Sequence, residues 1–280
     1  MSTAGVYAEV IGDPIAQSKS PLIHGFWLER LGIDGDYRAS RIMTGGLPDF
    51  FARRRSDASW RGCNVTIPHK QAVPGFCDEI DETASGIGAV NTIWRDPAGR
   101  LCGTNTDIEG VREAIAEADP ATGHAVVLGA GGAARAAFAA LGSGGWRQTR
   151  ILARDATKAR EAASSCGLSA QIEPFEADTG AFARAALVIN ATQLGMTGQN
   201  EMPAFVLQEL AQLSGDAVLF DMVYAPLETR LLSAARAIAL TPVDGLAMLI
   251  GQAARGFELF FGNPAPRDCD AELREKLLSL

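Results

Sequence analysis

The stretch HAVVLGAGGAARAAFAALG, residues 124–142, decides the fold of this chain. Its opening residues form a short apolar run typical of a buried strand, and the alanine-rich residues that close it favour a helix. The turn between them matches the G-x-G-x-x-A pattern of a dinucleotide-binding loop, in which missing side chains let the backbone approach a pyrophosphate at a helix N-terminus. A strand-to-helix turn built only for packing is the alternative. The stretch therefore predicts a Rossmann domain whose turn comprises Gly129, Ala130, Gly131, Gly132 and Ala133.

The next apolar run, TRILARDATKA at residues 149–159, carries charges where dinucleotide selectivity is read, about twenty residues after the glycines. Arg154 can hold a ribose 2′-phosphate bidentately, and Lys158 one turn later adds positive charge. Asp155 argues in the opposite direction, because a carboxylate near the ribose hydroxyls favours the unphosphorylated cofactor, although it can equally cap the following helix. The balance favours NADP and leaves NAD open.

Short apolar runs alternate with amphipathic stretches in the rest of the chain, which is typical of an α/β fold with a mostly parallel sheet. Strands are expected at residues 6–12 and 37–42, and helices at residues 21–31 and 46–55. Residues 89–107 predict a hairpin, since two extended segments flank a Pro/Gly turn. A helix is expected from Asp107, with one apolar face formed by Val111, Ala114, Ile115 and Ala118.

The stretch GCNVTIPHK, residues 62–70, has the alternation of a half-buried strand. Cys63, Val65 and Ile67 are expected on the buried face, and Asn64 and Thr66 on the face toward the site. Proline at position 68 removes a ladder donor and so ends the strand. Lys70 then leaves the sheet edge at a defined position.

Composition narrows the classes of function. The chain has 280 residues, is 47% hydrophobic and carries a net charge of −8 without a basic stripe, which argues against nucleic acid and anionic membranes as partners. Its five cysteines lack a C-x-x-C pair, and its three histidines have no metal-ligand spacing, so neither disulfides nor a metal site is expected. The N-terminus has no basic start followed by an apolar run, and no apolar stretch approaches a membrane span. We expect a cytoplasmic protein, monomeric or homodimeric, that acts on small molecules.

Polar segments end several of the predicted strands. Strand ends are where α/β sheets build sites, although each segment also has a local explanation as a helix cap or a turn. In order along nearly the whole chain, eight stretches resemble the shikimate dehydrogenase family. These stretches are GDPIAQSKSPLIH, GCNVTIPHK, GAVNTIW, GTNTD, LGAGGAARA, INATQLGM, DMVYAPLETRLL and DGLAMLIGQAARGFELF.

The resemblance implies an oxidoreductase that reduces 3-dehydroshikimate to shikimate with NADPH, on the route to chorismate and the aromatic amino acids. It implies a discontinuous N-terminal α/β substrate domain at residues 1–105 and 243–280. The Rossmann domain is expected at residues 106–242, with the active site in the cleft between the two domains.

The resemblance also implies the residues of the site. Lys70 and Asp107 match the catalytic pair. Ser18 and Ser20 match the residues that bind the substrate carboxylate, and the other substrate residues are Thr66, Asn91, Tyr224 and Gln252. For the cofactor, the resemblance matches Gly129, Gly131, Gly132 and Ala133 to the phosphate loop, Arg154 to the phosphate-holding arginine, and Asn190, Thr192 and Met196 to the wall near the nicotinamide. Ala130, Asp155, Lys158 and Gly245 are also expected on the cofactor side.

The chemistry asks for the same groups. Hydride reduction of a ketone leaves an alkoxide, so a proton donor must lie within hydrogen-bond reach of that oxygen. Lys70 can supply the proton, and a neighbouring Asp107 carboxylate would favour its ammonium form. In the reverse direction the same lysine accepts a proton, so oxidation gains at higher pH. Hydroxyl and amide donors suit a polyhydroxylated carboxylate.

Three positions depart from the family pattern. Gly25 follows the His of SPLIH where Asn is frequent, Ile108 replaces a common glycine, and only Arg154 is kept at the cofactor selector. One alternative is therefore a quinate/shikimate dehydrogenase that uses NAD. A second is an oxidoreductase acting on another cyclic acid, such as an amino-shikimate. A third is a catalytically silent dinucleotide-binding regulator, against which the presence of both Lys70 and Asp107 argues.

Overall fold

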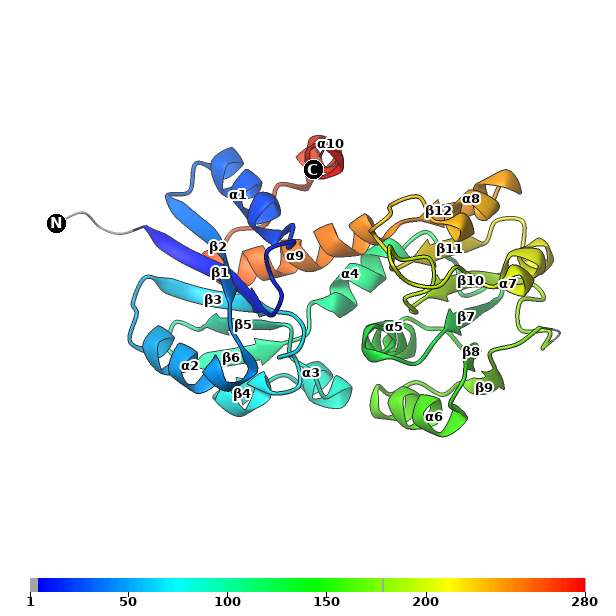
Figure 1. Cartoon of the computed structure of the whole chain (residues 1–280), viewed down its shortest axis with the longest axis horizontal. Coiled ribbons are helices and arrows are strands. Elements are labelled where there is room, and N and C mark those ends of the chain that lie inside the picture. Colours follow the sequence, from blue (N-terminus) through cyan, green and yellow to red (C-terminus); the bar gives the residue numbers. More distant parts are fainter. Residues whose placement is uncertain (1–4, 178, 280) are drawn as a thin grey trace. The chain divides into compact units, whose positions relative to one another are not determined.

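The computed structural model describes residues 5–177 and 179–279. The chain divides into two compact units (Figure 1): unit 1 is Met1–Thr106 with Gln252–Leu280, and unit 2 is Asp107–Gly251. The sequence placed the boundaries at residues 105/106 and 242/243, whereas these units divide after Thr106 and inside the long helix α9, Gly245–Phe261. Each unit has a sheet of its own.

Unit 1 is built on a six-stranded sheet in the order β2-β1-β3-β5-β6-β4. Its strands are β1 (Val6–Gly12), β2 (Gly35–Arg41), β3 (Trp60–Val65), β4 (Glu79–Ile80), β5 (Thr92–Arg95) and β6 (Leu101–Thr104), and its helices are α1 (Ser20–Leu31), α2 (Leu47–Arg55), α3 (Glu82–Ile87) and α10 (Asp270–Leu278). β1 pairs in parallel with β2 and β3, whereas β5 runs antiparallel to both β3 and β6. The hairpin predicted within residues 89–107 is therefore confirmed as β5 and β6.

Side chains of β3 alternate between the two faces of the sheet. Cys63 and Val65 are buried in an apolar core with the phenylalanines of α2, as predicted. Asn64 points to the other face, toward Gly256 of α9. The prediction that Ile67 is buried is wrong, because β3 ends at Val65 and Ile67 lies in the following turn with 65% of its surface exposed. The alternation holds only as far as the strand does.

Unit 2 has an all-parallel sheet in the order β12-β11-β10-β7-β8-β9, which is the doubly wound Rossmann order. Its strands are β7 (His124–Leu128), β8 (Thr149–Ala153), β9 (Gln171–Pro174), β10 (Ala185–Asn190), β11 (Val218–Asp221) and β12 (Thr241–Val243), and its helices are α4 (Asp107–Ala114), α5 (Gly132–Ser143), α6 (Ala156–Ser165), α7 (Ala204–Glu209) and α8 (Arg230–Ala237). The strand, turn and helix predicted from residue 124 onward are confirmed. The apolar helix face expected to reach Ala118 is too long, since α4 ends at Ala114.

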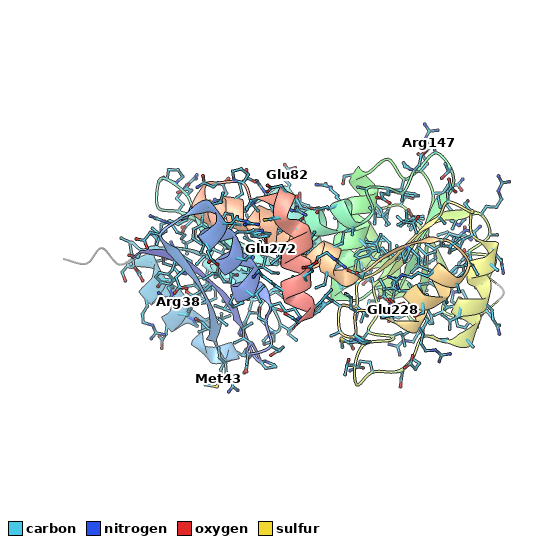
Figure 2. The ribbon with its side chains drawn as sticks, turned by 90° about the horizontal axis from the view of Figure 1, so that it is seen from above. Arg38, Met43, Glu82, Arg147, Glu228 and Glu272 are labelled. Atoms are coloured by element: carbon cyan, nitrogen blue, oxygen red, sulfur yellow. The ribbon has the colours of Figure 1, made fainter. Side chains whose placement is uncertain are left out.

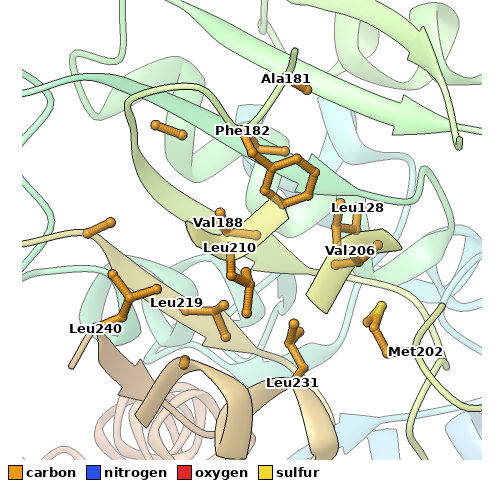
Figure 3. Packing of buried hydrophobic residues seen from close by; sticks show 14 of the residues in the cluster. Leu128, Ala181, Phe182, Val188, Met202, Val206, Leu210, Leu219, Leu231 and Leu240 are labelled. Carbon is orange, nitrogen blue, oxygen red and sulfur yellow. The ribbon is translucent and has the colours of Figure 1, made fainter. Parts of the chain in front are cut away.

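An apolar cluster packs one face of this sheet against α7 and α8 (Figure 3). Val188 and Leu219 contribute from β10 and β11, and Val206 and Leu231 from the two helices. Burying each such side chain stabilises the fold by roughly 1.5–3 kcal/mol. The cluster therefore holds β10 and β11 in place, and the loops after these strands carry several of the predicted site residues.

Charged side chains lie at the surface of each unit (Figure 2). Arg38 and Glu272 are exposed in unit 1, as are Arg147 and Glu228 in unit 2. Glu272 pairs with Arg30 across α10 and α1 at 2.5 Å, with both side chains about half exposed, so the pair adds little stability. Among the described residues, no helix has the length and apolar character needed to cross a membrane.

His24 is a fully buried histidine in α1. Its ring stacks on Tyr37 with centroids 3.9 Å apart and meets the edge of Trp27. Neither ring nitrogen has a hydrogen-bond partner among the described residues. Burial lowers the pKa of His24 from its usual 6.5 to about 3, so the ring is neutral in the folded protein.

His24 makes the free energy of unfolding depend on pH. Between pH 6.5 and about 3, His24 binds a proton in the unfolded chain but not in the folded chain. The unfolding free energy therefore falls as the pH drops through this window, by up to about 1.4 kcal/mol per pH unit. We expect His24→Phe to flatten this part of the curve, measured by urea unfolding between pH 7 and pH 4.5.

His124→Gln is the control for losing a histidine, because His124 is only half-buried and its ring bonds the carbonyl of Ala181. Its curve is expected to keep the slope of the parent protein. Equal slopes in the parent and in His24→Phe would show that His24 does not exclude its proton.

Candidate active site

Two loops of unit 1 meet at the carboxyl ends of β1 and β3. β1 lies between β2 and β3, and the connecting helices α1 and α2 cover opposite faces of the sheet (Figure 1), so this is the switch point where α/β sheets form sites. A Cβ added to Gly12 would lie 2.5 Å from Cγ2 of Thr66. The amide of Asp13 donates to the carbonyl of Ile67 at 3.1 Å. Thr66 therefore lies directly against the loop that leads into α1.

Lys70 lies half-buried in the turn that follows β3. His69, just before it, is fully buried, and its Nε2 lies 2.6 Å from the carbonyl oxygen of Ile42 at the end of β2. The carbonyl of Lys70 accepts a hydrogen bond from the amide of Val90 at 2.9 Å. The turn is thus fastened on both sides, and His69 supports the position of Lys70.

Asn91 reaches the same edge because β5 runs antiparallel to β3. The backbone of Asn91 accepts from the amide of Val65 at 2.7 Å and donates to the carbonyl of Thr104 at 3.1 Å. Its side chain is buried, and Oδ1 accepts from the backbone amide of Thr106 at 2.7 Å and from the Thr92 hydroxyl at 2.9 Å. These contacts hold the side-chain amide of Asn91 in one orientation.

The same hydrogen-bond network extends to α9 and to β3. The Thr106 hydroxyl lies 3.5 Å from Oε1 of Gln252, and Nδ2 of Asn64 donates to the Thr92 hydroxyl at 2.9 Å. Gln252 and Asn91 were predicted from the sequence as site residues, whereas Thr92 and Thr106 were not. Both threonines belong to the quoted GAVNTIW and GTNTD stretches, so position within a motif was the only signal available for them.

Ser18 and Ser20 lie at the start of α1. Oγ of Ser18 accepts from the backbone amide of Ser20 at 3.3 Å, and Ser20 is buried. The ammonium of Lys19, between them, donates to the carbonyl of Leu277 in α10 at 2.9 Å. The ammonium of Lys19, the middle residue of the SKS motif, therefore already has a partner in the C-terminal helix α10.

The glycine-rich turn of unit 2 joins β7 to α5. Gly129 has φ of 95°, and a Cβ placed there would lie 2.7 Å from Cγ2 of Thr192. A Cβ on Gly131 or Gly132 would meet no atom within 4 Å. No side chain caps the N-terminus of α5, so its first amides and the positive end of its dipole suit a phosphate group. The turn therefore fits a dinucleotide.

Asn190 ends β10 and is fully buried. Its Oδ1 accepts from the amide of Thr192 at 3.1 Å and from the Thr192 hydroxyl at 2.6 Å, and its Nδ2 donates to Oδ1 of Asp221 at 2.8 Å. Burial raises the pKa of Asp221, although hydrogen bonds from Thr229, Val223 and Asn190 oppose the rise. Asn190 therefore acts inside the unit, by fixing Thr192 against Gly129.

The selector residues follow β8 and are exposed. Oδ1 of Asp155 accepts from the backbone amide of Lys158 at 3.0 Å, which makes Asp155 the N-cap of α6. One carboxylate oxygen is thus committed to the helix, while the side chains of Arg154 and Lys158 extend into solvent. This geometry suits a phosphate beside Arg154.

The remaining predicted residues lie at loops and helix ends of unit 2. Met196 is half-buried in the loop after β10, and Tyr224 is 43% exposed in the loop after β11. Gly245 begins α9, where an added Cβ would lie 2.6 Å from the carbonyl of Met222, so the close approach requires glycine. Asp107 is the first residue of α4 and is half-buried.

Each unit thus brings a set of predicted residues together. Unit 1 gathers Thr66, Lys70 and Asn91 at the end of β3, and unit 2 gathers the glycine-rich turn and Thr192 at the switch point between β7 and β10. In the described parts of both units, no group of His, Cys, Asp and Glu side chains is arranged to hold a metal ion. The set in unit 1 presents a hydroxyl, an amide and an ammonium group to a ligand.

Comparison with known proteins gives matches over the whole chain. The family models for the shikimate dehydrogenase substrate binding domain and the shikimate 5′-dehydrogenase C-terminal domain match residues 10–93 and 245–272. The chain is 48% identical to shikimate dehydrogenase (NADP(+)) of Sphingopyxis alaskensis, covering 99% of this chain and 98% of the relative.

Two solved structures are also similar. Shikimate 5-dehydrogenase of Thermus thermophilus, in complex with NADP(H) and shikimate, has a TM-score of 0.83 at 36% identity, covering 97% of this chain and 99% of that one. Quinate dehydrogenase of Corynebacterium glutamicum, in complex with NAD, has a TM-score of 0.84 at 31% identity, covering 99% of each chain.

The two glycines of the turn are expected to have separable roles. Gly129→Ala forces an alanine to positive φ against the Thr192 methyl group, at a cost of about 1–2 kcal/mol for the backbone alone. We expect it to lower the melting temperature of the ligand-free protein. Gly131→Ala has open space around its Cβ and a negative φ, so it is expected to melt like the parent.

Titration with NADPH, followed by fluorescence, completes the test. Gly131→Ala is expected to weaken binding by about tenfold or more, because its methyl group occupies the approach to the phosphates. Parent-like affinity in Gly131→Ala would show that the phosphates bind elsewhere.

Proposed function

The chain belongs to the shikimate dehydrogenase family, and from that premise we propose that it reduces 3-dehydroshikimate to shikimate with NADPH, reversibly, in the route to chorismate and the aromatic amino acids. The observation that carries the proposal is the arrangement of Lys70 and Asn91 around the end of β3. Backbone hydrogen bonds of 2.9 Å from Val90 to Lys70 and of 2.7 Å from Val65 to Asn91 bring a potential proton donor and an oriented amide to one edge.

Substrate recognition in this proposal uses neutral hydrogen-bonding groups. Ser18 and Ser20 bind the carboxylate at the start of α1. The ring hydroxyls are bound by Thr66, Asn91 and Gln252, with Tyr224 also near the substrate. Such groups reject an analogue that lacks a hydroxyl, because a buried polar group would then lose its partner.

Lys70 moves the proton. As the ketone is reduced, its oxygen gains negative charge, and the Lys70 ammonium donates the proton that neutralises it. Asp107 is the second member of the proposed catalytic pair. When shikimate is oxidised, Lys70 accepts the hydroxyl proton in the reverse step.

NADPH, when bound, supplies the hydride. In this proposal Gly129 to Ala133 hold the pyrophosphate, and Arg154 and Lys158 hold the 2′-phosphate. Asn190 and Asp221 act through Thr192, and Met196 and Gly245 contribute to the remaining wall. Asp155 serves α6 as its N-cap, so its presence does not oppose NADP.

The second candidate function is a quinate/shikimate dehydrogenase that uses NAD. The similarity to an NAD complex of quinate dehydrogenase favours it. The capping role of Asp155 weakens it, because the carboxylate that would select NAD already bonds the backbone of Lys158. A silent regulator is less well supported, since both proposed catalytic residues are present.

We place the reaction in the cytoplasm, carried out by a monomer or homodimer. All five cysteines are free, which suits a reducing compartment. The ligands are small molecules, and the net charge of −8 gives no attraction to nucleic acid.

Steady-state rates with shikimate and quinate, each with NADP and NAD, test substrate and cofactor together. The proposal predicts the highest kcat/KM for shikimate with NADP. Arg154→Ala is expected to raise KM for NADP by about tenfold or more, because a charge-assisted bidentate contact is lost, and to change KM for NAD little. Higher kcat/KM for quinate with NAD in the parent would favour the second candidate.

Asp155→Asn is the matched variant for the selector, because asparagine keeps the N-cap but removes the charge. We expect parent-like cofactor preference and melting temperature. A large gain in preference for NADP would show that the Asp155 carboxylate takes part in selection.

Lys70→Ala removes the proposed proton donor. We expect kcat to fall by about 10²-fold or more, as for other general acids, while the affinity for NADPH stays nearly unchanged. Lys276→Ala is the control, since Lys276 is an exposed lysine of α10 in the same unit. Turnover by Lys70→Ala at the rate of the control would remove Lys70 from the mechanism.

A further inference from the structure

Tyr37 of β2 has no role in the function proposed so far. Only 5% of its surface is exposed. Its ring lies parallel to that of His24, with an interplanar angle of 1° and centroids 3.9 Å apart, and Phe260 of α9 packs at 6.3 Å. The ring is therefore held between α1 and α9, and its hydroxyl has a fixed position.

The hydroxyl begins a chain of hydrogen bonds that runs in one direction. Tyr37 donates to Oδ1 of Asn64 at 2.6 Å, and Nδ2 of Asn64 donates to the Thr92 hydroxyl at 2.9 Å. The Thr92 hydroxyl donates to Oδ1 of Asn91, also at 2.9 Å. The backbone amide of Thr106 can only donate and so fixes Oδ1 of Asn91 as an acceptor. Thr92 therefore donates to Asn91 and accepts from Asn64, which leaves Oδ1 of Asn64 to accept from Tyr37.

Asn64, the central link of this chain, has little freedom of its own. A Cβ added to Gly256 would lie 3.2 Å from Nδ2 and 3.6 Å from Oδ1 of Asn64, so α9 approaches the amide closely. A flip of this amide would leave Oδ1 facing the Thr92 hydroxyl and Nδ2 facing the hydroxyl of Tyr37. Because the Thr92 hydroxyl donates to Asn91, it accepts from Asn64, and the amide keeps the orientation in which Oδ1 faces Tyr37.

The ring of Tyr37 also packs against α1. Ser20 and His24 lie one turn apart on this helix, and His24 stacks on Tyr37. Burial raises the pKa of Tyr37 well above its ordinary value, and a side-chain hydrogen bond with Ser20 opposes the rise. Tyr37 therefore lies between Asn64 of β3 and the helix that carries Ser20.

We propose that Tyr37 is a positioning residue for substrate binding: its hydroxyl satisfies Oδ1 of Asn64 and thereby holds the Asn64 and Thr92 side chains in place beside Asn91. The inference rests on the proposed function, because Asn91 is one of its substrate-binding residues. A tyrosine needed only for packing would not require the hydroxyl, since the aromatic contacts with His24 and Phe260 belong to the ring.

Tyr37→Phe tests the inference, because it keeps the ring and removes the hydroxyl. We expect KM for shikimate to rise by about tenfold, the effect of losing one buried hydrogen bond in a site. The KM for NADP is expected to stay at the parent value, and kcat to change by less than about threefold, because the proton donor and the cofactor loop are not touched.

Tyr7→Phe is the matched control. Tyr7 lies on the neighbouring strand β1, and its hydroxyl also donates a hydrogen bond of 2.6 Å, to Asp57. A purely structural hydroxyl is expected to lower the melting temperature and leave both KM values unchanged. A Tyr37→Phe variant that behaves like Tyr7→Phe would overturn the proposal.

Thr92→Val supplies a second variant, because it breaks the same chain one link from Asn91. It is expected to raise KM for shikimate to a similar degree, and the double variant with Tyr37→Phe is expected to add less than the sum of the two effects. Parent-like KM in Thr92→Val, or full additivity in the pair, would overturn the link to Asn91 even if Tyr37→Phe folded poorly. Absence of shikimate oxidation by the parent would remove the proposed function, whereas parent-like KM in an active Tyr37→Phe would remove only the role of Tyr37.

Discussion

Both sheets depend on one constraint. At the switch point of each sheet, the helices that follow two adjacent strands cover opposite faces, and the loops that leave these strands lie close together at one edge. The strand at this point is β1 in unit 1 and β7 in unit 2. In each case a glycine ends or follows the strand, because a threonine methyl group fills the place of its side chain. Cγ2 of Thr66 would lie 2.5 Å from a Cβ on Gly12, and Cγ2 of Thr192 would lie 2.7 Å from one on Gly129. A larger residue at either position would have to displace the threonine or move the two loops apart.

The antiparallel hairpin of unit 1 brings the start of one strand to the edge where the parallel strands end, which a purely parallel sheet does not do. The start of β5 meets the end of β3, so Asn91 arrives beside the turn that carries Lys70. The end of β6 brings Thr106 to the same edge, where it bonds the amide of Asn91. Buried polar groups are costly unless they are satisfied, and here each supplies the partner of the next. The hydrogen bonds that satisfy these groups also orient the amide offered to a ligand.

Much of the fold followed from local sequence, because glycine patterns, apolar runs and the Pro/Gly turn act over a few residues. Ile67 shows where this reasoning ends, since alternation predicts burial only while a strand continues, and β3 stops two residues earlier. Asp155 had two readings in the sequence: its bond to the backbone of Lys158 confirms the capping role, and its part in cofactor selection stays a prediction. Tyr37 could not be found at all: its importance lies in a contact with Asn64, which is 27 residues away and carries no local signal.

Each unit holds one asparagine side chain by the same pair of hydrogen bonds from a threonine. The two asparagines differ in their surroundings, and this difference decides the role proposed for each. Oδ1 of Asn91 accepts from both the amide (2.7 Å) and the hydroxyl (3.2 Å) of Thr106. Oδ1 of Asn190 accepts from the amide (3.1 Å) and the hydroxyl (2.6 Å) of Thr192. Nδ2 of Asn190 donates to Asp221 and to the carbonyl of Leu194, so Asn190 can influence a cofactor through Thr192 and the loop that follows β10. Asn91 lies at the end of β3 beside the Lys70 turn, and for this reason the same residue type is proposed as a substrate ligand in one unit and as a support in the other.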